Sequence, residues 1–87
     1  MQYAYYDLGE QKENATVEIT LSSAANVQLL DTANYDLFRH HQEHKSIGQY
    51  VYLSPHRITI PEERHWYVAI EAPGDMTHSV RILPATA

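Results

Sequence analysis

Hydrophobic and polar residues alternate along much of the chain, and a spacing of two is typical of strands with one buried face. Residues 16–21 place Val17, Ile19 and Leu21 on one side, with polar residues between them. The same alternation predicts further strands in the tyrosine-rich start, around Val27 and Leu29, and in residues 49–53, 57–60, 65–71 and 79–82. Six to eight short strands separated by turn residues indicate an all-β fold, a small antiparallel β-sandwich.

Breaks in the alternation coincide with Pro, Gly and Ser, which close turns between strands. One such break, residues 72–75, reads as a type II turn with Pro73 and Gly74 at its centre. The apolar strand faces supply the expected core of a single domain spanning residues 1–87. Its expected members are Val17, Ile19, Leu21, Val27, Leu29, Ile58, Ile60, Trp66, Val68, Ile70, Val80 and Ile82.

Residues 32–44 depart from the alternation and predict one short helical turn. Asp31 precedes this segment, and its carboxylate can accept hydrogen bonds from the first backbone N–H groups of a helix. Tyr35 and Phe38 are three residues apart, so they share one helical face, which we expect to turn toward the core.

Composition narrows the classes of function. The 87 residues include eleven Asp and Glu against six Lys and Arg, so the net charge of −5 disfavours binding to duplex nucleic acid. No apolar run approaches the length of a membrane span, so we expect no membrane partner. The chain contains no cysteine, which excludes disulfides and thiolate metal sites. Together with a start unlike a signal peptide, this favours the cytoplasm.

The densest polar cluster is the segment 39–45, which contains Arg39, His40, His41, His44 and Lys45. Histidine titrates near neutral pH, so the cluster can bind an anion more strongly as the pH falls. If the segment is helical, His40 and His44 lie four residues apart on one face and can present two imidazoles to a metal ion. The third interpretation is a solvated helix end or loop. We expect no metal and no other cofactor.

A second candidate surface is aromatic. Tyr50 and Tyr52 share one face of their strand, and Tyr67 lies on the face opposite Trp66, next to His65. If these faces coincide, they form a surface for a planar ligand or a protein partner. Cross-strand tyrosine pairing without any ligand is the alternative. His65 offers a general base, but the sequence supplies no nucleophile-elbow motif, so we expect no catalytic residues and no enzyme activity.

Two blocks of residues resemble a known family. The first block comprises Tyr5-Tyr6-Asp7-Leu8-Gly9, Val17-Glu18-Ile19-Thr20-Leu21, Ala24-Ala25-Asn26-Val27-Gln28-Leu29-Leu30-Asp31 and Asn34-Tyr35. The second comprises Ser54-Pro55-His56-Arg57-Ile58-Thr59-Ile60-Pro61 and His65-Trp66-Tyr67-Val68-Ala69-Ile70. In this order they resemble the bacterial family DUF1883. The resemblance implies a compact β-sandwich without assigned catalytic residues, in proteins that can carry a Toll/interleukin-receptor (TIR)-type domain.

The chain departs from the family between the two blocks. The family tends to carry many Arg and Lys and a Gly-rich hairpin there, whereas residues 39–50 of this chain carry three histidines. The sequence therefore leads us to expect a binding or sensing module for a small anionic ligand or a protein partner. The alternative is a self-assembly module, in which tyrosine-bearing faces or strand edges join copies into a homo-oligomer.

Overall fold

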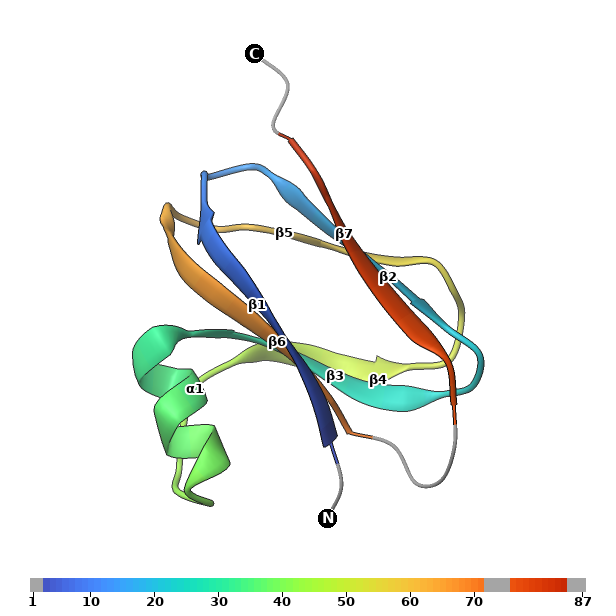
Figure 1. Ribbon diagram of the computed structural model, residues 1–87, viewed down its shortest axis with the longest axis horizontal. Coiled ribbons are helices and arrows are strands. Elements are labelled where there is room, and N and C mark those ends of the chain that lie inside the picture. Colours follow the sequence, from blue (N-terminus) through green and yellow to red (C-terminus); the bar gives the residue numbers. More distant parts are fainter. Residues whose placement is uncertain (1–2, 72–75, 85–87) are drawn as a thin grey trace.

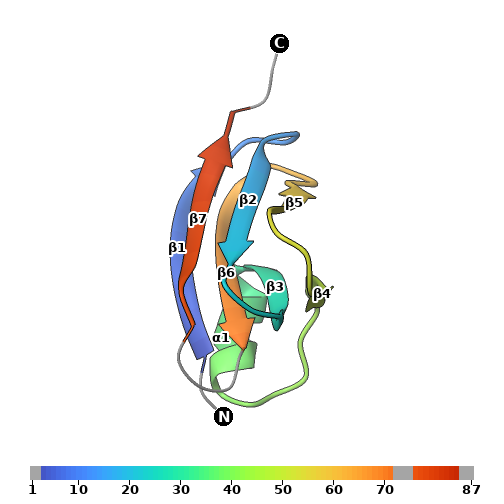
Figure 2. The same cartoon turned by 90° about the vertical axis from the view of Figure 1, so that its right-hand side faces the viewer.

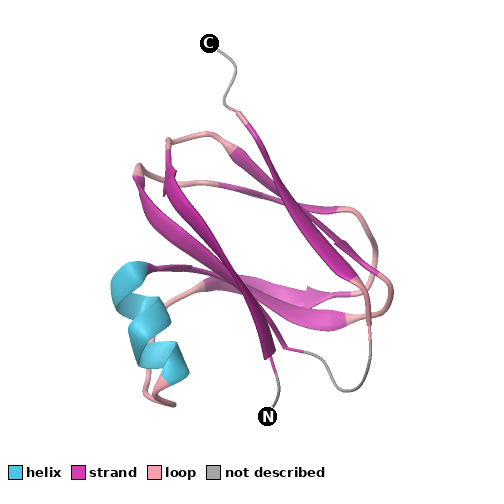
Figure 3. Ribbon diagram, in the orientation of Figure 1, coloured by secondary structure: helices cyan, strands magenta, loops and turns pink. Residues whose placement is uncertain are grey.

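The computed structural model describes residues 3–71 and 76–84. Its strands and helix follow one another along the chain as β1 (Tyr3–Gln11), β2 (Thr16–Leu21), β3 (Ala25–Asp31), α1 (Thr32–Arg39), β4 (Ile47–Val51), β5 (His56–Thr59), β6 (Arg64–Glu71) and β7 (His78–Leu83). These elements confirm the predicted β-sandwich with one short helix, as Figure 3 shows. The expected type II turn at 72–75 lies outside the described residues.

Two antiparallel sheets face each other across the core (Figures 1 and 2). One sheet has the strand order β1-β6-β3-β4, and the other has the order β5-β2-β7. Because side chains alternate between the faces of a strand, the apolar residues of both sheets meet between them. All twelve residues of the predicted core lie in this cluster or pack against it, with Val80 and Ile82 only partly buried.

The strand β4 differs from the prediction by two residues. It covers Ile47–Val51 rather than 49–53, and Tyr52 and Leu53 follow it in the connection to β5. Its partner is β3, with Leu29 opposite Ile47. Propensity alone does not fix such ends, because the register with the neighbouring strand decides which residues join the ladder.

The helix α1 is shorter than the predicted segment 32–44. Asp31 is its N-cap, as expected, but the helix ends at Arg39 and His41 adopts a left-handed backbone conformation with φ of 59°. His40 and His44 therefore do not share a helical face, and the alternative of two imidazoles presented by one helix, which required a helix through residue 44, is not formed. A left-handed residue directly after a helix stops the chain from continuing it.

The helix also packs on a different surface from the one we expected. Tyr35 and Phe38 do not enter the core between the sheets; they pack against Tyr67 and Tyr3 on the outer face of the four-stranded sheet. The reason is that tyrosines of β1 and β6 point outward there and offer an apolar strip to the helix. Leu30 in β3 is fully buried as a result. In the part of the chain that the structure describes, no helix combines the length and the hydropathy needed to cross a bilayer.

Candidate functional site

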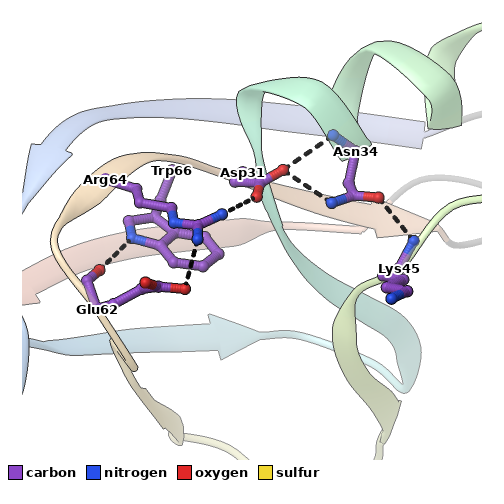
Figure 4. Close-up of polar contacts among 6 residues, drawn as sticks. All are labelled: Asp31, Asn34, Lys45, Glu62, Arg64 and Trp66. Carbon is purple, nitrogen blue, oxygen red and sulfur yellow. Dashed lines mark hydrogen bonds and ion pairs between the residues drawn. The ribbon is translucent and has the colours of Figure 1, made fainter.

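A chain of polar contacts fixes the point at which β4 begins (Figure 4). Oδ1 of Asp31 accepts hydrogen bonds from the backbone N and from Nδ2 of Asn34, both at 2.9 Å. Oδ1 of Asn34 accepts one from the backbone N of Lys45 at 2.8 Å, and Nη1 of Arg64 donates to Oδ2 of Asp31 at 2.8 Å. Burial raises the pKa of Asp31, but the bonds from Asn34 and Arg64 outweigh it and hold this pKa below its ordinary value.

A cavity of about 410 Å³ lies beside this network, with Lys45, Glu62, Arg64 and Trp66 in its lining. Arg64 pairs with Glu62 at 2.8 Å in addition to Asp31, and Nε1 of Trp66 donates to the backbone carbonyl oxygen of Glu62 at 3.0 Å (Figure 4). Two carboxylates thus neutralise Arg64. Lys45 makes no ion pair with any residue that the structure describes.

The structure separates the side chains of the segment 39–45. Nε of Arg39 pairs with Oδ1 of Asp36 at 3.1 Å, and Nδ1 of His40 donates to the backbone carbonyl oxygen of Asp36 at 2.8 Å. Lys45 lines the cavity beside the Asp31 network, while His41 and His44 line another. The five residues therefore do not converge on one point. Within the described ranges, no three His, Asp or Glu side chains are grouped closely enough to hold a metal ion.

The second cavity, of about 340 Å³, lies on the outer face of the four-stranded sheet beside the end of α1. Nε2 of His44 donates to Oε1 of Gln28 at 2.8 Å, and Nε2 of Gln28 donates to the carboxylate of Glu71. A negative charge therefore stands in the same cavity as His41 and His44. It opposes the binding of an anion there, because like charges repel.

Tyr67 belongs to the contact between α1 and the sheet. Its ring stacks on that of Tyr35, with centroids 4.3 Å apart and planes 8° from parallel. Tyr35 also packs against Tyr5. Burial, followed by a hydrogen bond with Tyr3, raises the pKa of Tyr35 to about 12. The structure thus places Tyr67 under the helix, away from the exposed Tyr50 and Tyr52.

His65 lies on the face opposite Trp66, as its strand position predicted, and its ring packs beside Tyr67. Its Nε2 donates to Oδ1 of Asp7. The same oxygen accepts the backbone N–H of Gly9 at 2.9 Å. This backbone bond, and then the contact with His65, hold the pKa of Asp7 below its ordinary value.

Exposed apolar side chains gather on and directly after β4. The exposed fraction is 42% for Ile47, 58% for Tyr50, 74% for Tyr52 and 75% for Leu53. Oγ of Ser54 accepts the backbone N–H of Leu21 at 2.9 Å and lies 3.2 Å from its carbonyl oxygen. This contact holds the β4–β5 connection against β2, so the exposed residues are presented from a fixed backbone.

The two long sides of the sandwich differ. On one side, the hydroxyl of Tyr6 in β1 donates to the backbone carbonyl oxygen of His78 in β7 at 3.1 Å and joins the sheets. On the other, β4 and β5 are the outermost strands of their sheets and lie on the same side of the molecule (Figure 2). A groove of about 290 Å³ runs between them, lined by residues 47–49 and 56–59. We take this groove and the free edge of β4 as the candidate site.

The sequence signal for this site was present but incomplete. Residues 46–55 carry no charged side chain, and Tyr50 and Tyr52 were already candidates. What the pattern did not indicate is that β4 is an edge strand. Strand order depends on which distant segments pair, and periodicity carries no such information.

Comparisons with known proteins agree with the resemblance drawn from the two sequence blocks. A family model described as a domain of unknown function, DUF1883, matches residues 1–86. No curated protein and no solved structure matches the chain. The match covers nearly the full length, and the chain belongs to the DUF1883 family.

Proposed function

We propose that the chain is a non-catalytic binding module that holds an extended segment of a protein partner against the free edge of β4. The observation that carries the proposal is the coincidence of three features on this strand. Its outer edge pairs with no other described strand, its side chains include the exposed Ile47 and Tyr50, and a groove lies beside it. An extended peptide can add a strand to such an edge through backbone hydrogen bonds.

A binding role accords with the contacts of three of the candidate histidines. His65 is engaged by Asp7, His44 by Gln28 and His40 by the backbone of α1. In the same proposal the module works in the bacterial cytoplasm. There, a TIR-type domain of the kind that the family resemblance implies would act as the effector while this domain selects the partner.

A small anionic ligand has less support as the binding partner. Arg64 is already paired with two carboxylates, and Glu71 stands beside His41 and His44. Lys45 offers an unpaired cation at the cavity beside the Asp31 network. One ammonium group gives little selectivity for an anion over water, because its charge is screened at an open surface.

The test uses a phage-displayed library of random peptides, selected on the immobilised wild-type chain. We expect enriched peptides to slow hydrogen exchange of the backbone amides in β4. Ile47→Lys should weaken their binding by about tenfold or more, because a charge on an edge strand opposes strand addition. Ser79→Lys, which adds the same charge to the exposed surface of edge strand β7, is the matched control and should bind as wild type.

Two results would contradict the proposal. Either the selection yields no peptide that protects β4, or the enriched peptides bind Ile47→Lys as strongly as they bind Ser79→Lys.

A further inference from the structure

We infer that β4 of a second copy of this chain occupies the free edge of β4, so that two four-stranded sheets join into one continuous antiparallel sheet. The inference rests on the proposed function, because it names the occupant of the same edge. Its basis is a self-complementary pattern of side chains along the strand.

The register follows from the two faces of β4. Ile47, Gln49 and Val51 face the core side, since they are paired with the buried Leu29, Val27 and Ala25 of β3. Gly48 and Tyr50 therefore face outward. In a two-fold arrangement centred on Gln49, core-facing residues of one copy meet core-facing residues of the other. Ile47 then lies opposite Val51, and Gly48 lies opposite Tyr50.

This register places a large side chain opposite the residue that lacks one. A Cβ added to Gly48 would meet the backbone carbonyl oxygen of Val27 at 2.6 Å, so the position requires glycine and leaves bare backbone on the outer face. Tyr50 is 58% exposed and has no strand beyond it among the described residues. An aromatic ring across from a glycine covers such backbone and stabilises the pair. The two-fold supplies this contact twice.

Charge favours this edge over other surfaces for self-association. Each copy carries a net charge of −5, which disfavours close approach in general. Residues 46–55 carry no charged side chain, so the paired strands bring no like charges together. Lys45 of one copy lies opposite Leu53 of the other in this register. Exposed Ile47 also loses contact with water, which adds a favourable hydrophobic contribution.

The size of the contact determines its strength. A ladder of five residues on each strand gives a small interface, and interfaces that bury less than about 1,200 Å² are usually weak and transient. We therefore expect a dimer that forms with rising protein concentration. The two-fold uses both β4 edges and closes the assembly, so the contact does not propagate into fibres.

The decisive experiment uses a single introduced cysteine, because the chain has none of its own. In the Gln49→Cys chain, the two cysteines lie directly opposite each other across the two-fold. Opposite residues of antiparallel strands have Cα atoms about 4.5–5.5 Å apart, which is within the range that a disulfide bridges. Mild oxidation should give a covalent dimer. Ser79→Cys, at an exposed position on β7, is the matched control. Its cross-linking rate should be lower than that of Gln49→Cys by about tenfold or more.

Sedimentation of the wild-type chain over a concentration series gives the second readout. The average mass should rise toward twice that of the monomer, and Ile47→Lys should keep the chain monomeric. If Gln49→Cys cross-links no faster than Ser79→Cys, or the wild-type mass does not rise, the inference is wrong. If library peptides still protect β4 in that case, the proposed function remains valid. If the peptides do not protect β4 and the dimer does not form, the proposed function and the dimer inference are both wrong.

Discussion

Two glycines show how single positions constrain this small sandwich. Gly9 lies in β1 at φ of 69°, where the register with β6 shifts, and a Cβ there would touch nothing within 4 Å. At Gly48 in β4 the constraint is steric instead, since an added Cβ would meet the carbonyl oxygen of Val27 at 2.6 Å. Gly9 is needed for its backbone conformation, and Gly48 for the close approach of two strands.

Gly48→Ala should therefore destabilise the chain more than Gly9→Ala. We expect a loss of about 1–3 kcal/mol for Gly48→Ala, because the backbone of β3 must shift to accept the methyl group. Gly9→Ala should cost about 1–2 kcal/mol, from the left-handed conformation alone. Urea unfolding measures both, and hydrogen exchange should show faster opening of β4 only in Gly48→Ala. If the loss of stability in Gly48→Ala is equal to or smaller than that in Gly9→Ala, the backbones of β3 and β4 can move apart at little cost in free energy.

At the scale of the elements, Asp31 couples three segments that are separate in the sequence. It caps α1 through Asn34, pairs with Arg64 at the start of β6, and acts through Asn34 on the backbone of Lys45 just before β4. The helix contains only eight residues, too few to be stable by itself. Its position, and with it the start of the candidate edge, depends on this network and on the aromatic contacts beneath it.

Asp31→Ala should destabilise the protein by about 1–2 kcal/mol, which is the usual cost of a lost N-cap. Asp36→Ala is the control within the same helix. Asp36 is exposed and, among the residues that the structure describes, pairs with Arg39 and His40 only, so its removal should cost about 1 kcal/mol or less. Urea midpoints of the two variants measure the difference. Equal midpoints would mean that the network around Asp31 contributes little beyond a surface ion pair.

At the scale of the whole molecule, different kinds of contact stabilise the outer faces of the two sheets. The four-stranded sheet is covered by α1, whereas the three-stranded sheet has a charged outer row instead. There, Glu18 in β2 lies between Arg57 of β5 and Arg81 of β7 and pairs with both. The carboxylate is almost fully buried by these neighbours. The hydrogen bond from Arg81, followed by that from Arg57, lowers the pKa of Glu18.

This lowered pKa gives a signed prediction for acid. The folded state binds the Glu18 proton more weakly than the unfolded state, whose pKa is about 4.3. The stabilisation is therefore complete above that pH and is lost as the pH falls through the folded value. The urea midpoint of the wild type should drop between about pH 5 and pH 2, and Glu18→Gln should show a smaller drop.

Glu10→Gln, at an exposed position of β1, is the matched control and should keep the drop of the wild type. Some acid sensitivity should remain in Glu18→Gln, because the pKa values of Asp7 and Asp31 are also lowered. A drop in Glu18→Gln as large as that in the wild type would show that Glu18 does not couple folding to pH.

The strand pattern of this sequence determined the fold class, the buried face of each strand and the N-cap at Asp31. Each of these depends on residues close in the sequence: alternate apolar positions define a strand face, and a carboxylate before a helix meets its first N–H groups. The tertiary structure alone decided that β4 is an edge, that α1 covers the outer face through Tyr35 and Phe38, and that the side chains of the segment 39–45 diverge. These outcomes depend on contacts between segments far apart in the chain. Periodicity shows which face of a strand is apolar, but it does not show which strand lies beside it or whether any strand does.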